Sequence, residues 1–261
     1  MKLPRVLTLA LCEIGLLTTS AFAGVTTSIP ATDTTPTIPA YIAKPDGAAP
    51  APGVLILHGC EGYSDRLAKV ADWLASHGYV GIAIDTLAPQ GISNACSGVA
   101  EASHIEADDA RATIAWMRTQ PYIDAGHLAV IGYSMGGIAV LNLAVPRMPS
   151  GAAGVQAAIA YYPACHNRDP QSVVAPLLIL NGDADDWIPP QACQDFAKAA
   201  AAAGKAVSIT TYPGAKHAFN FEGPDRVVLG HHLGYDATAA ADSDVQTLHF
   251  LRQYLTASPA P

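Results

Sequence analysis

The chain has 261 residues, of which 50% are hydrophobic and 14% charged, and this composition excludes a mostly disordered protein. The 14 Lys and Arg against 22 Asp and Glu give a formal net charge of −8. The basic residues form no cluster, so we expect no binding of nucleic acid through its phosphates. Beyond the N-terminus no apolar run reaches the roughly 18 residues of a membrane span, and we therefore expect no stable membrane anchor.

The first 23 residues resemble a secretory signal peptide. Lys2 and Arg5 form a basic start, residues 6–17 are mostly apolar, and the Ala-Phe-Ala sequence at 21–23 fits a cleavage site. Cleavage would remove two basic residues and one acidic residue, which changes the formal net charge from −8 to −9. We therefore expect residues 1–23 to direct export to the periplasm or out of the cell.

Strand and helix patterns alternate along the rest of the chain. Residues 24–36 are rich in Thr and Pro and predict a flexible lead-in, and residues 257–261 form a short tail. Residues 38–43, which include a proline, are expected to form an edge strand. Further strands are predicted at 54–57, 79–84, 128–131, 155–161, 176–180 and 207–212, with helices between them and after the last. This order predicts one α/β domain over residues 37–256, with a mainly parallel sheet and helices on both faces.

The clearest catalytic motif is the G-x-S-x-G sequence at residues 132–136, between a predicted strand and a predicted helix. In that context the serine lies on a sharp turn at the carboxyl edge of the sheet, and glycines let the backbone segments pass closely. Ser134 is therefore the candidate nucleophile. A glycine-rich turn with an idle serine is the alternative.

A serine hydroxyl needs a base to remove its proton. Of the nine histidines, His217 alone follows the last predicted strand on the loop beyond its carboxyl end, where such a sheet places catalytic groups. The orienting acid should lie between Ser and His in the chain. Asp183, Asp185 and Asp186 compete for this role, and Asp185 fits best from its spacing to the surrounding glycine and proline.

Two backbone N–H groups are expected to form an oxyanion hole. One belongs to Met135, directly after the nucleophile, and the other to Cys60, in the loop after the strand at 54–57. We expect His58 to shape this loop rather than act as a second base. Three aromatic residues are candidates for the substrate pocket, namely Tyr63, Trp187 and Phe219.

Cysteine use also favours export. After signal cleavage four cysteines remain, and they allow three disulfide connectivities. None forms a C-x-x-C pair, so we expect no zinc site and no other metal. Neighbouring strands would bring together the loops that carry Cys60 and Cys96, and likewise those of Cys165 and Cys193, so these two pairs are predicted. Four unpaired buried thiols are the alternative.

Over residues 37–256 the sequence resembles the dienelactone hydrolases of the α/β-hydrolase superfamily. The resemblance rests on the opening strand at 38–45, the acid loop at 182–189, the histidine loop at 212–219 and the terminal segment at 235–251. It implies a single-domain hydrolase of esters and lactones, without a cofactor, a metal or a large lid.

The chain departs from the family pattern at four positions. The family nucleophile is cysteine, whereas this chain has Ser134, which implies the chemistry of a serine esterase. The family's gating glutamate corresponds to Gly59. Its two carboxylate-binding arginines correspond to Pro89 and Phe221, which cannot pair with an anion. A negatively charged protein also repels anionic substrates, so we expect a neutral ester or lactone.

The sequence therefore predicts a serine hydrolase with a Ser-His-Asp triad and an acyl-enzyme intermediate. A peptidase of the same superfamily is one alternative, although the short chain leaves no room for an additional gating domain. A catalytically inactive binding domain is the other alternative, and it would need a broken triad. The sequence leaves the physiological substrate and the oligomeric state open.

Overall fold

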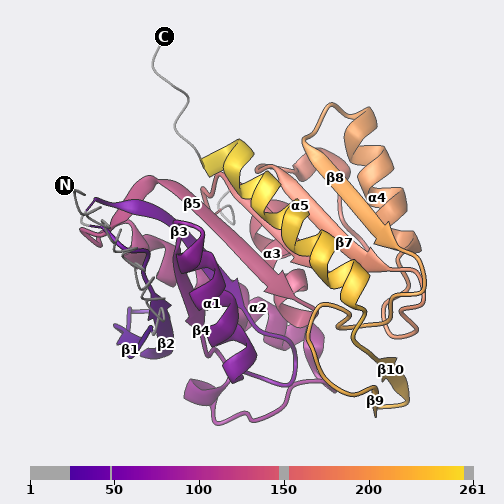
Figure 1. Ribbon diagram of the computed structural model, residues 1–261, viewed down its shortest axis with the longest axis horizontal. Helices are drawn as coiled ribbons and strands as arrows, with labels where there is room; N and C mark the ends of the chain where they lie inside the picture. The colour runs from indigo at the N-terminus through magenta and orange to yellow at the C-terminus, as the bar shows by residue number, and fades with distance from the viewer. Residues whose placement is uncertain (1–23, 48, 147–152, 256–261) are drawn as a thin grey trace, which may run out of the picture.

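The computed structural model describes residues 24–47, 49–146 and 153–255. Eight strands form one sheet, in the spatial order β1-β2-β4-β3-β5-β6-β7-β8 (Figure 1). Their bounds are β1 (Val25–Ile29), β2 (Ile38–Ala43), β3 (Ala51–Leu57), β4 (Val80–Ile84), β5 (Ile123–Tyr133), β6 (Ala157–Tyr161), β7 (Leu177–Gly182) and β8 (Val207–Tyr212). The six strands from β3 to β8 are parallel, and β2 pairs antiparallel with both β1 and β4.

The central strands consist of continuous apolar runs because both of their faces are covered. All five residues of β4 are buried, and Leu55, Ile56 and Leu57 of β3 have no exposed surface. A parallel sheet that is buried on both sides needs such runs rather than an alternation of apolar and polar residues. The mainly parallel α/β sheet predicted from the sequence is confirmed.

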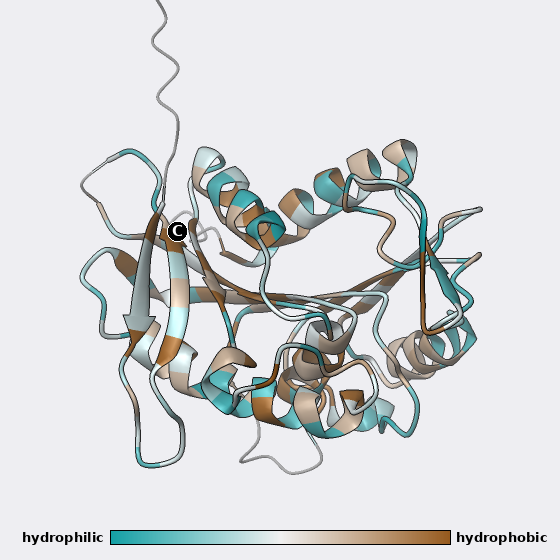
Figure 2. Cartoon of the chain, turned by 90° about the horizontal axis from the view of Figure 1, so that it is seen from below, coloured by the Kyte–Doolittle hydropathy of each residue, from teal (hydrophilic) through white to brown (hydrophobic). Residues whose placement is uncertain are grey.

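In the described part of the chain five α-helices cover the sheet, and their bounds are α1 (Asp65–Ser76), α2 (Val99–Met117), α3 (Met135–Ala144), α4 (Gln191–Ala202) and α5 (Ala237–Leu255). Apolar side chains of α1 and α5 pack on one face of the sheet, and those of α2, α3 and α4 pack on the other. Figure 2 shows the sheet edge-on between these two layers. No helix in the described part of the chain is long and apolar enough to cross a membrane.

Two expectations about the N-terminal part are wrong. Within the predicted flexible lead-in at 24–36, residues 25–29 form strand β1 in register with β2, from Val25 opposite Ile42 to Ile29 opposite Ile38. Backbone pairing and the burial of Ile29 overcome the Thr and Pro content of this segment. Consequently β2 lies inside the sheet and β1 forms its edge. The predicted signal peptide and the tail at 257–261 lie outside the described residues.

A small hairpin that the sequence did not indicate lies beyond the carboxyl ends of the parallel strands. Its strands are β9 (Arg226–Val228) and β10 (His231–Leu233), and Figure 1 shows them at the lower right of the sheet. The hairpin is tied to the loop after β8 by a bridge between Leu233 and His217 and by a hydrogen bond from Gly234 N to His217 O. It therefore brings a late part of the chain to the edge of the sheet where His217 lies.

Candidate active site

Ser134 lies in a strained turn between β5 and α3. Its φ of 55° and ψ of −111° are rarely adopted by a residue with a side chain, so the surrounding structure must hold it. A Cβ atom on Gly132 would lie 2.1 Å from the Gly136 carbonyl oxygen, and one on Gly136 would lie 2.6 Å from that of His58. Glycine is required at both positions because the backbone segments pass so closely. The turn places Ser134 at the N-terminus of α3, where the helix dipole favours negative charge.

The structure brings Ser134, His217 and Asp185 together from three separate loops. Nε2 of His217 lies 2.9 Å from Oγ of Ser134, and Nδ1 of the same ring lies 2.7 Å from Oδ2 of Asp185. His217 is 2% exposed and Asp185 is 3% exposed, whereas Ser134 is partly accessible. A hydroxyl, an imidazole and a buried carboxylate in this order can activate the serine oxygen as a nucleophile.

Backbone hydrogen bonds fix the carboxylate of Asp185. Its Oδ1 atom accepts from the N–H groups of Trp187 at 2.9 Å and Ile188 at 2.8 Å, which leaves Oδ2 for the histidine. The other two candidate acids are exposed and point elsewhere. Asp183 accepts from the backbone of Gly214, and Asp186 accepts from His232 on the hairpin, an interaction that lowers the pKa of Asp186.

The predicted oxyanion donors lie next to the nucleophile. Met135 begins α3 directly after Ser134, and Cys60 lines the pocket that opens over the serine. A Cβ atom on Gly59 would lie 3.7 Å from Cβ of Ser134, so the peptide group between Gly59 and Cys60 lies close to the nucleophile. The N–H of Gly136 donates to the His58 carbonyl oxygen at 2.9 Å and joins the two segments.

A pocket of about 440 Å³ opens over Ser134 and His217. Trp187 lines it, as expected from the sequence. Phe219 does not, because it is fully buried in the core beneath α1 and α5, and Tyr63 packs against that same core. Phe221, which corresponds to a carboxylate-binding arginine of the family, also lines the pocket. Other aromatic and aliphatic lining residues were missed by the sequence analysis, namely Leu67, Tyr133, Tyr162 and Leu233.

Tyr162 was missed because nothing in its local sequence marks it. It follows β6 with a φ of 38°, and its ring centroid lies 4.6 Å from that of His217. Trp187 contacts the histidine as well, with a centroid distance of 5.2 Å. The imidazole therefore has an aromatic neighbour from each of two loops, and these neighbours restrict its orientation.

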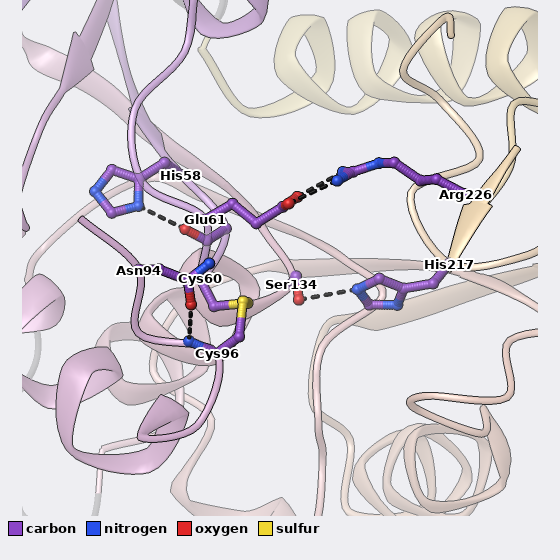
Figure 3. The surroundings of a disulfide bond; sticks show 9 residues. His58, Cys60, Glu61, Asn94, Cys96, Ser134, His217 and Arg226 are labelled. Carbon is purple, nitrogen blue, oxygen red and sulfur yellow. Dashed lines mark hydrogen bonds and ion pairs between the residues drawn. A yellow bond between two sulfur atoms is a disulfide. The ribbon is translucent and has the colours of Figure 1, made fainter. Parts of the chain in front are cut away.

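An ion pair spans the pocket lining. Arg226 of the hairpin donates through both terminal nitrogens to Glu61, at 2.6 and 2.5 Å (Figure 3). This pairing lowers the pKa of Glu61. The partners are 165 residues apart in the chain, so their contact could not be predicted from local sequence patterns. Arg66 also lines the pocket and lies over the ring of Phe221.

Two disulfides flank the site, in the pairs expected from the order of the strands. Cys60 is bonded to Cys96, with 4.8 Å between their Cα atoms, and Cys165 to Cys193, with 4.9 Å. Figure 3 shows the first disulfide beside Ser134, on the loop that carries the Cys60 amide. The second joins the loop after β6 to the start of α4. Among the described residues, no group of three or more His, Cys, Asp or Glu could hold a metal ion.

Comparison with known proteins identifies the family of the chain. The family model described as "Dienelactone hydrolase family" matches residues 38–255. The chain belongs to the dienelactone hydrolase family. It is thus a carboxylic-ester hydrolase, and the resemblance seen in the sequence is confirmed.

Two relatives and one solved structure show what the chain is similar to. A Methylorubrum extorquens protein with the name "Putative carboxymethylenebutenolidase" is 28% identical, over 83% of this chain and 77% of its own. "Cutinase 1" of Thermobifida cellulosilytica is 35% identical, over 52% of this chain and 48% of its own. The crystal structure of a dienelactone hydrolase-like promiscuous phosphotriesterase from metagenomic libraries has a TM-score of 0.70 and 20% identity, and it covers 90% of this chain and all of its own.

Proposed function

We propose that the protein hydrolyses a carboxylic ester or lactone through an acyl-enzyme formed on Ser134. The observation that carries the proposal is the continuous chain of contacts from Ser134 Oγ through His217 to Asp185, at 2.9 and 2.7 Å. This chain ends at a serine oxygen that is accessible from a pocket.

Each group has a defined task in this reaction. Ser134 Oγ attacks the carbonyl carbon while Nε2 of His217 takes its proton, and the carboxylate of Asp185 stabilises the imidazolium. The negative oxygen of the tetrahedral intermediate accepts from the N–H groups of Cys60 and Met135. His217 then protonates the leaving alcohol oxygen as its bond to carbon breaks. A water molecule, activated by the same histidine, hydrolyses the acyl-enzyme and restores Ser134.

We further propose that the substrate is neutral. The charge of Arg226 is compensated by Glu61, and much of the remaining lining is aromatic or aliphatic. Neither Pro89 nor Phe221 offers a charge to a substrate carboxylate. Arg66 also lines the pocket, and its positive charge is the feature that would favour an anionic substrate instead.

Export is the third part of the proposal. The basic and apolar start of the chain resembles a signal peptide, and the two disulfides are of the kind that persists in oxidising compartments. N-terminal sequencing of the protein from the periplasm or medium of an expressing cell should give Gly24 as the first residue. A protein that retains residues 1–23 inside the cell would contradict this part.

Two measurements test the reaction. A fluorophosphonate probe should label Ser134, and Ser134→Ala should fold normally but lose about 10⁴-fold or more in kcat. A panel of p-nitrophenyl esters, lactones and aminoacyl amides then separates an esterase from a peptidase, and a matched pair of esters with and without a distal carboxylate tests the neutral substrate. Activity that survives in Ser134→Ala would overturn the proposal.

A further inference from the structure

A buried histidine outside the triad holds the peptide group that carries one oxyanion donor. His58 follows β3 and has no exposed surface. Its Nε2 atom lies 3.1 Å from the backbone N of Thr86, which can only donate. Nε2 must therefore be the unprotonated nitrogen of the ring, and the ring proton lies on Nδ1. Burial lowers the pKa of His58, which favours this neutral form.

The proton on Nδ1 has a defined acceptor. Nδ1 of His58 lies 2.8 Å from the carbonyl oxygen of Gly59, so the ring donates to that oxygen. The same oxygen accepts from the N–H of Gly62 at 3.0 Å. Two donors from different directions thus fix the position of the Gly59 carbonyl.

The Gly59 carbonyl and the Cys60 N–H belong to one planar peptide group. No cis peptide bond occurs in the described part of the chain, so the N–H points to the side opposite the carbonyl oxygen. Holding the oxygen therefore also fixes the direction of the N–H. Hydrogen bonds accepted by a carbonyl polarise its peptide, which makes the attached N–H a stronger donor.

The backbone of His58 is fixed on both sides as well. Its N–H donates to Oε1 of Glu106 at 3.0 Å, and its carbonyl oxygen accepts from the N–H of Gly136 at 2.9 Å. Glu106 on α2 is fully buried. Gly136 is the neighbour of Met135, the residue with the second oxyanion donor. His58 is thus hydrogen-bonded to Gly59 and to Gly136, which are the neighbours of Cys60 and Met135, the two residues proposed to donate to the oxyanion.

We propose that His58 is a positioning residue that directs the Cys60 N–H toward the developing oxyanion, through its hydrogen bond to the Gly59 carbonyl. The proposal rests on the function proposed above for Ser134. It predicts that loss of the Nδ1 donor weakens stabilisation of the transition state while substrate binding and the triad remain.

Substitutions can separate the donor from the bulk of the ring. Asparagine places an N–H donor at the position of Nδ1, glutamine places it one atom further out, and leucine retains volume without a donor. His58→Leu should lower kcat by about 10- to 100-fold, less than the loss of a complete oxyanion donor. His58→Asn should recover most of this activity, His58→Gln should not, and KM should change by less than about 3-fold.

A comparison of each p-nitrophenyl ester with its thionoester gives a readout that a purely structural role would not move. Sulfur is a poor hydrogen-bond acceptor, so the ratio of the ester rate to the thionoester rate reports the oxyanion hole. This ratio should fall in His58→Leu and His58→Gln by about the same factor as kcat, and it should be restored in His58→Asn. Rates are expressed per active site, counted by complete fluorophosphonate labelling.

The matched control is Leu74→Ala, which destabilises the buried core beside α1 at a residue that does not line the pocket. It should lower Tm and leave the ratio unchanged. If His58→Leu does not fold, the ratio of ester to thionoester rates in His58→Asn and His58→Gln tests the role of His58. A higher ratio in His58→Asn than in His58→Gln supports it, and equal ratios contradict it. An unchanged ratio in the His58 variants, with Ser134→Ala inactive, would overturn the role of His58 alone. An active Ser134→Ala would instead overturn the proposed triad.

Discussion

Oδ2 of Asp185 lies 2.7 Å from Nδ1 of His217, while Oδ1 of the same carboxylate accepts two backbone N–H groups. The carboxylate thus has one oxygen committed to its own loop and one committed to the imidazole. Neither Asp183 nor Asp186 contacts His217 in this way.

Asp185→Asn should therefore lower kcat by about 10³- to 10⁴-fold, because an amide can favour the wrong tautomer of His217. Asp183→Asn and Asp186→Asn are matched controls from the same loop, and both should stay within a few fold of the unmodified protein. Steady-state kinetics of the three purified variants makes the comparison. A larger loss in Asp183→Asn than in Asp185→Asn would assign the acid to a different position of the loop.

The activity should depend on pH through His217, since a general base must be unprotonated in the free enzyme. We expect kcat/KM on a slow ester to be low in acid, where a general base is protonated, and to rise to a plateau as the pH increases. The profile should be measured within the pH range in which circular dichroism shows an intact fold. A flat profile over this range would argue against a histidine base.

The two disulfides should differ in their effect on catalysis. The double variant Cys60→Ala with Cys96→Ala frees the loop that carries the proposed oxyanion donor, so kcat should fall in addition to a loss of stability. The double variant Cys165→Ala with Cys193→Ala should mainly lose stability, by about 2–4 kcal/mol. Urea unfolding and kinetics of both variants measure the two effects, and equal losses of kcat would contradict the distinction.

Asp109 on α2 should make the stability depend on pH. It is 2% exposed, and burial, with a smaller contribution from the charge of Asp108, raises its pKa to about 7. The unfolded carboxyl has its ordinary pKa of about 4. Between about pH 4 and 7 the folded protein thus retains a proton that the unfolded chain has released, so the free energy of unfolding decreases as the pH rises through this window.

Asp109→Asn should remove this contribution. The difference in the free energy of unfolding, variant minus unmodified protein, should be about 1–3 kcal/mol more favourable at pH 8 than at pH 5. Urea unfolding at the two pH values provides the measurement. Asp108→Asn, the adjacent exposed carboxyl, serves as the control and should show little difference between the two pH values. The same pH dependence in both variants would argue against burial as the cause.

The three residues that the sequence proposed as a triad, and that lie within hydrogen-bond distance in the structure, carry local sequence signals. Ser134 lies between closely passing glycines in a fixed pattern. Asp185 follows the buried strand β7 and His217 follows β8, the last strand of the sheet, and the carboxyl ends of these parallel strands meet at one edge. Strand order also sufficed for the cysteine pairs, because adjacent strands bring adjacent loops together.

What the sequence missed depends on contacts between distant segments. The pairing of Glu61 with Arg226 and the position of Tyr162 beside His217 follow from packing in three dimensions. Phe219 lies two residues from His217 but is buried in the core rather than in the pocket. Its distance along the chain from His217 does not reveal this direction. Strand β1 has a composition typical of a loop, but all five of its residues pair with β2, and this pairing makes it a strand.

The β9–β10 hairpin is attached to the catalytic machinery at both of its strands. Arg226 binds Glu61 next to Cys60, and His232 binds Asp186 next to Asp185, the proposed catalytic acid. Its turn at Leu229 and Gly230 is exposed, and the hairpin is separate from the main sheet. The turn can therefore change in length or composition without disturbing the sheet, whereas the two anchoring residues cannot change freely. The two hairpin residues that line the pocket, Arg226 and Leu233, lie in β9 and β10 rather than in the turn, so a segment outside the main sheet supplies part of the pocket wall beside Ser134.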